Sequence, residues 1–164
     1  MKQILLILII SSIYTLEPNP TPNGNEYKIT TSTSLFEVYV EAAKKGIKPG
    51  DVFEFQKGTH SDTQYMGSIT GTEENPIIIR GVEGAVIASP TTFHLERPTH
   101  VRIENLEIKQ TEGVGLNIFA GNNIVISGLT IHHTKLGGMK VAGKNILVTG
   151  NHLYECSQGN YELN

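Results

Sequence analysis

The sequence feature that most restricts the possible fold is a repeat of 22 to 23 residues in the C-terminal half of the chain. Residues 101–108 align with residues 124–131 at an offset of 23, and residues 146–153 follow 22 positions later. Each copy contains two short runs of alternating apolar residues, which is the periodicity of a β-strand. A period this short, with β-branched strands and no helical pattern, indicates a solenoid in which each repeat forms one turn, or coil, of a parallel β-helix.

Every repeat interrupts its apolar alternation at one equivalent position between the two runs. These positions hold Asn105, Gly128 and Gly150. Asparagine and glycine are the residues that most readily adopt a left-handed backbone conformation. We therefore expect a tight turn between the first and second strands of each coil.

A third strand can be placed in each coil, and the connection before each of the last three is seven residues long. The expected strands cover residues 93–96, 116–119, 139–142 and 161–164. Their alternation predicts an internal column made by Leu95, Ile118, Val141 and Leu163. Burial of one such side chain stabilises a fold by roughly 1.5 to 3 kcal/mol. The predicted class is all-β: a right-handed, single-stranded parallel β-helix of about five coils over residues 48–164.

The N-terminal third divides into three further segments. Residues 1–16 combine Lys2, an apolar run and small polar residues, which predicts a signal peptide and a secreted protein that leaves the membrane after cleavage. The alternative is an uncleaved anchor, because no clean cleavage site of small residues is visible. Residues 17–32 are rich in Pro, Asn and Thr and are expected to form a spacer. Residues 33–47 predict an amphipathic helix that caps the first coil, since Ser34 and Glu37 have the spacing of a capping box.

Composition excludes some classes of partner. The formal net charge is −3, so nothing favours nucleic-acid binding, which requires a basic patch.

Cys156 is the single cysteine, so no internal disulfide can form. It is either a thiol held in a turn or a residue that pairs with another chain or segment.

Two motifs resemble those of a known superfamily. The segment KPGDVFEFQKGTH at residues 48–60 is similar to the "pGD-strand-dGtY" opening of secreted right-handed parallel β-helix proteins, and GTEENPIIIRG at residues 71–81 is similar to their "GT-x-x-NPI-x-I-x-g" signature. Both most resemble the N-terminal part of the chondroitinase B and alginate lyase group of the pectin-lyase-like superfamily. The resemblance implies acidic polysaccharide as the partner. It also implies longer relatives whose catalytic residues lie in later coils, so we expect residues 48–164 to be a truncated β-helix.

The outward side chains of the third strands form two candidate rows. They are His94, Asn117, Lys140 and Glu162 in one row, and Glu96, Phe119, Ala142 and Asn164 in the other. In polysaccharide-processing β-helices such a sheet lines the sugar groove. β-Elimination at a uronate needs a group that neutralises the carboxylate and a base. Lys140 and His94 are the catalytic candidates. Asn117, Phe119, Glu96 and Glu162 are the substrate-binding candidates.

Metal ions and other cofactors are not expected. His132 and His133 are adjacent on a connection between strands, where neighbouring side chains should point in different directions, so they are a poor pair of metal ligands. A transition-metal site that also includes His152 is a weak alternative. Calcium occurs in the family that the motifs resemble, but it needs six to eight oxygen ligands. Asp51 and Asp62, the two aspartates of the chain, lie far from the candidate rows.

Three functions remain open at this stage. In the first, the chain is a polysaccharide lyase-like protein, or the N-terminal piece of one that is inactive alone. In the second, it is a non-catalytic surface or matrix protein that binds glycans or proteins. In the third, it is a structural unit that stacks end to end; if further coils complete the C-terminus, a monomer is expected instead. One scaffold serves all three roles, so fold does not decide between them.

Overall fold

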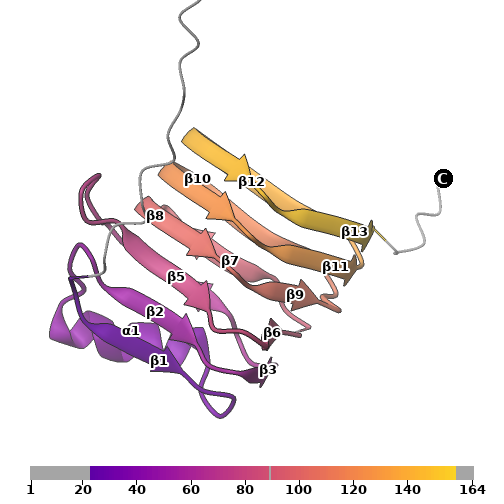
Figure 1. Ribbon diagram of the computed structural model, residues 1–164, viewed down its shortest axis with the longest axis horizontal. Helices are drawn as coiled ribbons and strands as arrows, with labels where there is room; N and C mark the ends of the chain where they lie inside the picture. Colours follow the sequence, from indigo (N-terminus) through magenta and orange to yellow (C-terminus); the bar gives the residue numbers. More distant parts are fainter. Residues whose placement is uncertain (1–22, 89, 158–164) are drawn as a thin grey trace, which may run out of the picture.

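The computed structural model describes residues 23–88 and 90–157, which form a solenoid of parallel strands with a helix at one end (Figure 1). Within these residues the elements are β1 (Glu26–Ile29), α1 (Leu35–Lys45), β2 (Val52–Phe55), β3 (Gly58–His60), β4 (Tyr65–Met66), β5 (Ile77–Gly81), β6 (Ala85–Ile87), β7 (Phe93–Glu96), β8 (Thr99–Glu104), β9 (Glu107–Lys109), β10 (Val114–Ser127), β11 (Thr130–Thr134), β12 (Gly137–Thr149) and β13 (His152–Cys156). The parallel β-helix predicted from the sequence is confirmed.

Each coil contributes to three faces. The first face is made by β1, β2, β5, β8 and the second halves of β10 and β12. The second face is the five-stranded sheet of β3, β6, β9, β11 and β13. The third face is made by β4, β7 and the first halves of β10 and β12. Because β10 and β12 run around a corner without a break, the first and third faces belong to one sheet.

The interior is a stack of apolar side chains in strict register. Leu95 pairs with Ile118, and Ile118 pairs with Val141. Leu95 and Ile118 are 0% exposed, whereas Val141 in the last described coil is half-buried. The predicted internal column is therefore confirmed for these three residues, and Leu163 lies outside the described residues. Nearer the helix the coils are filled by rings, with Phe55 edge-on to Phe93 at 6.2 Å.

Left-handed residues form the corners, as the sequence predicts. Asn105, Gly128 and Gly150 have φ values of 53°, 65° and 62°. Gly143 stands at a different corner, with a φ of 156°, and a Cβ there would overlap the carbonyl oxygen of Gly121 in the preceding coil. This close approach coincides with a register shift between β10 and β12, where the offset falls from 23 to 22 residues.

The helix covers the first coil, where β1 and β2 lie (Figure 1). Ser34 and Glu37 form the predicted capping box, with both reciprocal hydrogen bonds present. Leu35 and Ala42 are buried in the core. The helix therefore shields the apolar interior at the end of the solenoid. No helix within residues 23–88 and 90–157 is long and apolar enough to cross a membrane.

The structure differs from the sequence-based expectation for the segment before the helix. Residues 26–29 were expected to lie in a spacer, but they form β1, which pairs with β2 from Glu26↔Val52 to Ile29↔Phe55. Residues 48–164 supply five strands of the first face, as expected, and β1 adds a sixth, so the solenoid has about six turns. The physical reason is that Ile29 is buried and Tyr27 stacks on Phe53 at 5.0 Å, so β1 closes the core. The predicted signal peptide lies outside the described residues.

Candidate functional site

The third face carries the predicted row of outward side chains. Successive strands pair Tyr65 with His94, His94 with Asn117, and Asn117 with Lys140. The structure thus brings together three predicted residues and adds Tyr65, which sequence reasoning missed. Residues 65 and 94 are 29 positions apart, outside the regular period, so no repeat signal identifies Tyr65.

Direct contacts order the first half of this row. The ring of Tyr65 stacks on the imidazole of His94, with centroids 5.5 Å apart and an interplanar angle of 4°. Asn117 Nδ2 donates a hydrogen bond to His94 Nδ1 over 2.8 Å. Because an amide nitrogen only donates, Nδ1 is the acceptor and a neutral His94 carries its proton on Nε2. With the Asn117 amide in this orientation, the nitrogen of His94 left for a ligand is Nε2, which is then a hydrogen-bond donor.

The second row is partly occupied by interactions within the protein. Glu96 pairs in register with Phe119, accepts a 2.9 Å hydrogen bond from the Tyr65 hydroxyl, and forms a 2.9 Å ion pair with Arg97. The hydrogen bond to the Glu96 carboxylate is the main cause that raises the pKa of Tyr65, and burial adds to it. Phe119 is 56% exposed, which leaves its ring accessible to a ligand. The register shift begins after Ile118, so Ala142 has no paired position beside Phe119.

Lys140 is the cation of the row. It is exposed and makes no ion pair with any described residue. Two strand spacings separate it from His94, with β10 between them, which places the two backbones about 10 Å apart. Glu162 and Asn164, the predicted last members of the two rows, lie outside the described residues.

Comparison with known proteins bears on the fold. Residues 73–163, more than half of the chain, match the family model described as the right handed beta helix region. The chain belongs to this family. A solved structure of a mannuronic acid specific polysaccharide family 6 lyase enzyme from human gut microbiota is similar, with 14% sequence identity and a TM-score of 0.47. The match covers 76% of this chain and 37% of that chain. No curated protein sequence matches.

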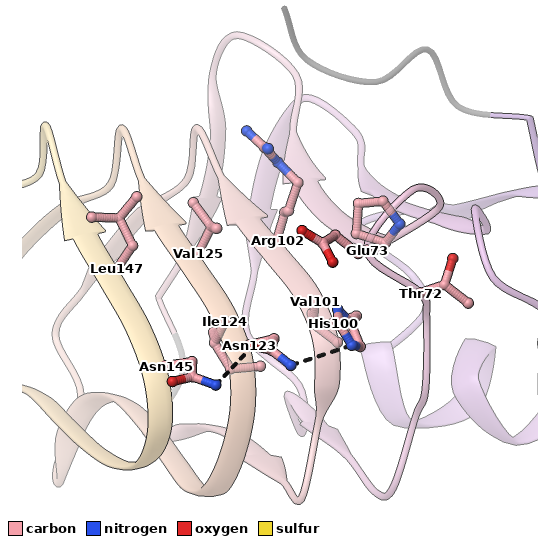
Figure 2. Close-up of a pocket in the computed structure, with 11 residues that line it drawn as sticks. Thr72, Glu73, His100, Val101, Arg102, Asn123, Ile124, Val125, Asn145 and Leu147 are labelled. Atoms are coloured by element: carbon pink, nitrogen blue, oxygen red, sulfur yellow. Dashed lines mark hydrogen bonds between the residues drawn. The ribbon is translucent and has the colours of Figure 1, made fainter. Parts of the chain in front are cut away.

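The β-helix also has a shallow cavity of about 280 Å³ on its first face (Figure 2). One side is a ladder in which Asn145 Nδ2 donates to Asn123 Oδ1 over 3.1 Å and Asn123 Nδ2 donates to His100 Nε2 over 3.2 Å. All three residues have φ values between 50° and 54°, so they occupy equivalent corners of successive coils. Since these polar groups bond to one another, the ladder holds the corners of the β-helix in register.

A row of charges crosses the first face of the β-helix near its helical end. Arg80 Nε donates to Glu54 Oε2 over 2.8 Å, and Gln56 Nε2 donates to Glu54 Oε1 over 2.9 Å. Burial alone would raise the pKa of Glu54, but these hydrogen bonds and the charge of Arg80 outweigh it and lower the pKa. Glu54 is therefore held as a carboxylate in the folded protein.

Proposed function

We propose that this chain is a secreted polysaccharide lyase-like β-helix protein that binds acidic polysaccharide along its third face. The observation that supports the proposal best is the row Tyr65–His94–Asn117–Lys140 with the exposed Phe119 ring beside it. The row combines an exposed cation, an amide, a ring donor and an aromatic surface on consecutive strands. These groups complement the carboxylates, hydroxyls and apolar ring faces of a glycan that carries uronate groups.

Each side chain has a chemical role in this proposal. The ammonium group of Lys140 neutralises a uronate carboxylate by a charge-assisted hydrogen bond. The Oδ1 atom of Asn117 accepts, and Nε2 of His94 donates, hydrogen bonds to sugar hydroxyls. The ring of Phe119 packs on the apolar face of a pyranose ring. Glu96 repels the glycan little, because Arg97 and the Tyr65 hydroxyl already engage its carboxylate.

Binding is the activity that this geometry supports better than β-elimination. A lyase needs a base beside the same sugar whose carboxylate is neutralised. Lys140 and His94 stand two strands apart, and the hydrogen bond from Asn117 leaves the His94 proton on Nε2. We therefore propose that the third face holds the polysaccharide and that Lys140 and His94 are its principal polar contacts.

Glycan titration of the full chain tests this proposal. Alginate, chondroitin and pectate are titrated calorimetrically, with neutral dextran as a control ligand. We expect Lys140→Ala to lower the affinity for the preferred acidic glycan about tenfold, equivalent to about 1.4 kcal/mol, and Phe119→Ala to lower it severalfold. Lys144→Ala is the matched control, because Lys144 is also exposed and lies on the same strand. The proposal fails if Lys140→Ala binds as wild type or if Lys144→Ala loses as much affinity.

A second assay distinguishes binding from turnover. Unsaturated uronate is followed by ultraviolet absorbance on the same three glycans. Product that disappears in Lys140→Ala extends the role of the third face to catalysis. Product that persists in Lys140→Ala shows that the reaction takes place elsewhere on the chain.

A further inference from the structure

A second group of ionisable side chains lies on the second face, away from the proposed glycan row. His132 and His133 are neighbours on β11, and a 2.6 Å hydrogen bond joins their Nδ1 atoms, so one of these nitrogens carries a proton that a bound metal would displace. The sequence predicts that adjacent histidines diverge, and here that expectation is wrong. His133 has a φ of 53°, and this left-handed turn folds its ring back toward His132.

Both imidazoles are fixed through their other nitrogen. His132 Nε2 lies 3.2 Å from Glu107 Oε1, and His133 Nε2 lies 2.8 Å from Glu155 Oε2. A histidine that ligates a metal commonly donates its second ring N–H to a carboxylate, which fixes the ring and raises the basicity of the ligating nitrogen. The two imidazoles therefore have, at Nε2, the carboxylate partners expected of paired metal ligands.

Packing holds the ring of His132 in place, while the ring of His133 stays accessible to solvent. The ring of His132 stacks on Tyr154, with centroids 4.7 Å apart and an interplanar angle of 5°. The His132 side chain is 11% exposed, while that of His133 is 46% exposed. A ligand thus reaches the pair from the His133 side, where solvent supplies further donor atoms.

We propose that His132 and His133 form a binding site for a divalent transition metal, with copper(II) or nickel(II) preferred. Two nitrogens bound at 2.0–2.1 Å with a 90° angle are about 2.9 Å apart, so the pair needs to open by only about 0.3 Å from the observed 2.6 Å. A tetrahedral zinc site needs a separation of about 3.3 Å. Square-planar or tetragonal nitrogen coordination is typical of copper(II) and nickel(II).

The surrounding charges favour a dication. Glu107 and Glu155 each face one ring, and the nearby cation is Lys109, whose Nζ lies 2.9 Å from Glu107. The described residues contain no cluster of three or more His, Cys, Asp or Glu side chains able to hold a metal. The inferred site therefore has two protein nitrogens, and water completes the coordination. It is independent of the glycan row.

Copper(II) titration of the full chain, followed by electron paramagnetic resonance, tests the inference. Copper(II) is kept at or below one equivalent per chain, so that the tightest site fills first. We expect one copper(II) per chain with superhyperfine splitting from two imidazole nitrogens. His133→Gln should lower the affinity at least tenfold and leave one nitrogen. His152→Gln is the matched control, since His152 is exposed on the same face and contacts Tyr154 but neither Nδ1 atom.

Three results overturn the inference. They are an absence of stoichiometric binding, a wild-type spectrum and affinity in His133→Gln, or an equal loss of affinity in His152→Gln. Far-ultraviolet circular dichroism of each variant verifies that the fold is intact. His132→Gln provides a second measurement: it should also lose one nitrogen from the spectrum, and an unchanged spectrum counts against the site.

Discussion

The internal column predicts a gradient of mutational cost along the solenoid axis. Ile118 is 0% exposed and lies between Leu95 and Val141, whereas Val141 is half-buried in the last described coil. Ile118→Ala removes three carbons, worth about 2.4 kcal/mol at ~0.8 kcal/mol each. The cavity left between two packed neighbours raises the total to about 3–4 kcal/mol. Val141→Ala removes two carbons that are half-buried, which corresponds to about 0.8 kcal/mol.

Urea unfolding followed by far-ultraviolet circular dichroism measures both free energies. The expected difference between the two variants is about 2–3 kcal/mol, well above the few tenths that separate typical surface substitutions. Leu95→Ala serves as a second interior variant and should resemble Ile118→Ala. If Val141→Ala destabilises the protein as much as Ile118→Ala does, then the column is not packed as described and the reasoning is refuted.

Three other predictions concern the corners, the third face and the first face. Gly143→Ala should lower the free energy of unfolding by more than about 2 kcal/mol, because the new Cβ overlaps the stacked backbone of the preceding coil. Gly150→Ala should lower it by only about 1 kcal/mol, because the space around this left-handed corner is open. Equal unfolding midpoints for the two variants would contradict this. Tyr65→Phe should lower the free energy of unfolding by about 1 kcal/mol. It should also remove one tyrosine of raised pKa from the alkaline ultraviolet titration, since the hydrogen bond to Glu96 raises that pKa. An unchanged titration argues against the hydrogen bond. The lowered pKa of Glu54 stabilises the folded state above the unfolded value of about 4.3, and this contribution is lost as the pH falls through the folded pKa. Glu54→Gln should therefore lower stability at neutral pH and flatten the acid limb of the stability profile, and a limb as steep as that of wild type would count against this role.

The fold was predictable because its signal is distributed over many residues. Alternating apolar positions repeated at 22 to 23 residues specify both the strands and the axial column, and Asn105 and its glycine equivalents mark the corner. β1 was not predictable in this way. It has four residues, with Tyr27 and Ile29 turned inward, and it is a strand because it pairs with β2. Tertiary pairing here overrides a local composition that favours a loop.

The candidate site was predictable in position but not in its contacts. Register alone places His94, Asn117 and Lys140 in one row, because outward residues of successive coils stack. No sequence pattern reveals that Glu96 is engaged by Arg97, since that depends on side-chain direction. The approach of the two adjacent histidines on the second face was hidden for a similar reason. A left-handed conformation is uncommon for residues other than glycine, histidine adopts it more often than most of them, and nothing in the sequence marks His133 for it.

The separation of interior and exterior positions makes the functional tests interpretable. On the third face, Lys140 and Phe119 are exposed, and the core column is built by the residues that alternate with them. Alanine at Lys140 removes an exposed group without leaving a cavity, so the free energy of unfolding should change by less than about 0.5 kcal/mol. Alanine at Phe119 removes six ring carbons from a side chain that is 56% exposed, which corresponds to about 2 kcal/mol, and circular dichroism verifies that this variant stays folded. A loss of glycan affinity in these variants can then be attributed to the face itself. The same argument does not extend to Tyr65, whose hydroxyl is bonded to Glu96, because its substitution changes both stability and the shape of the row.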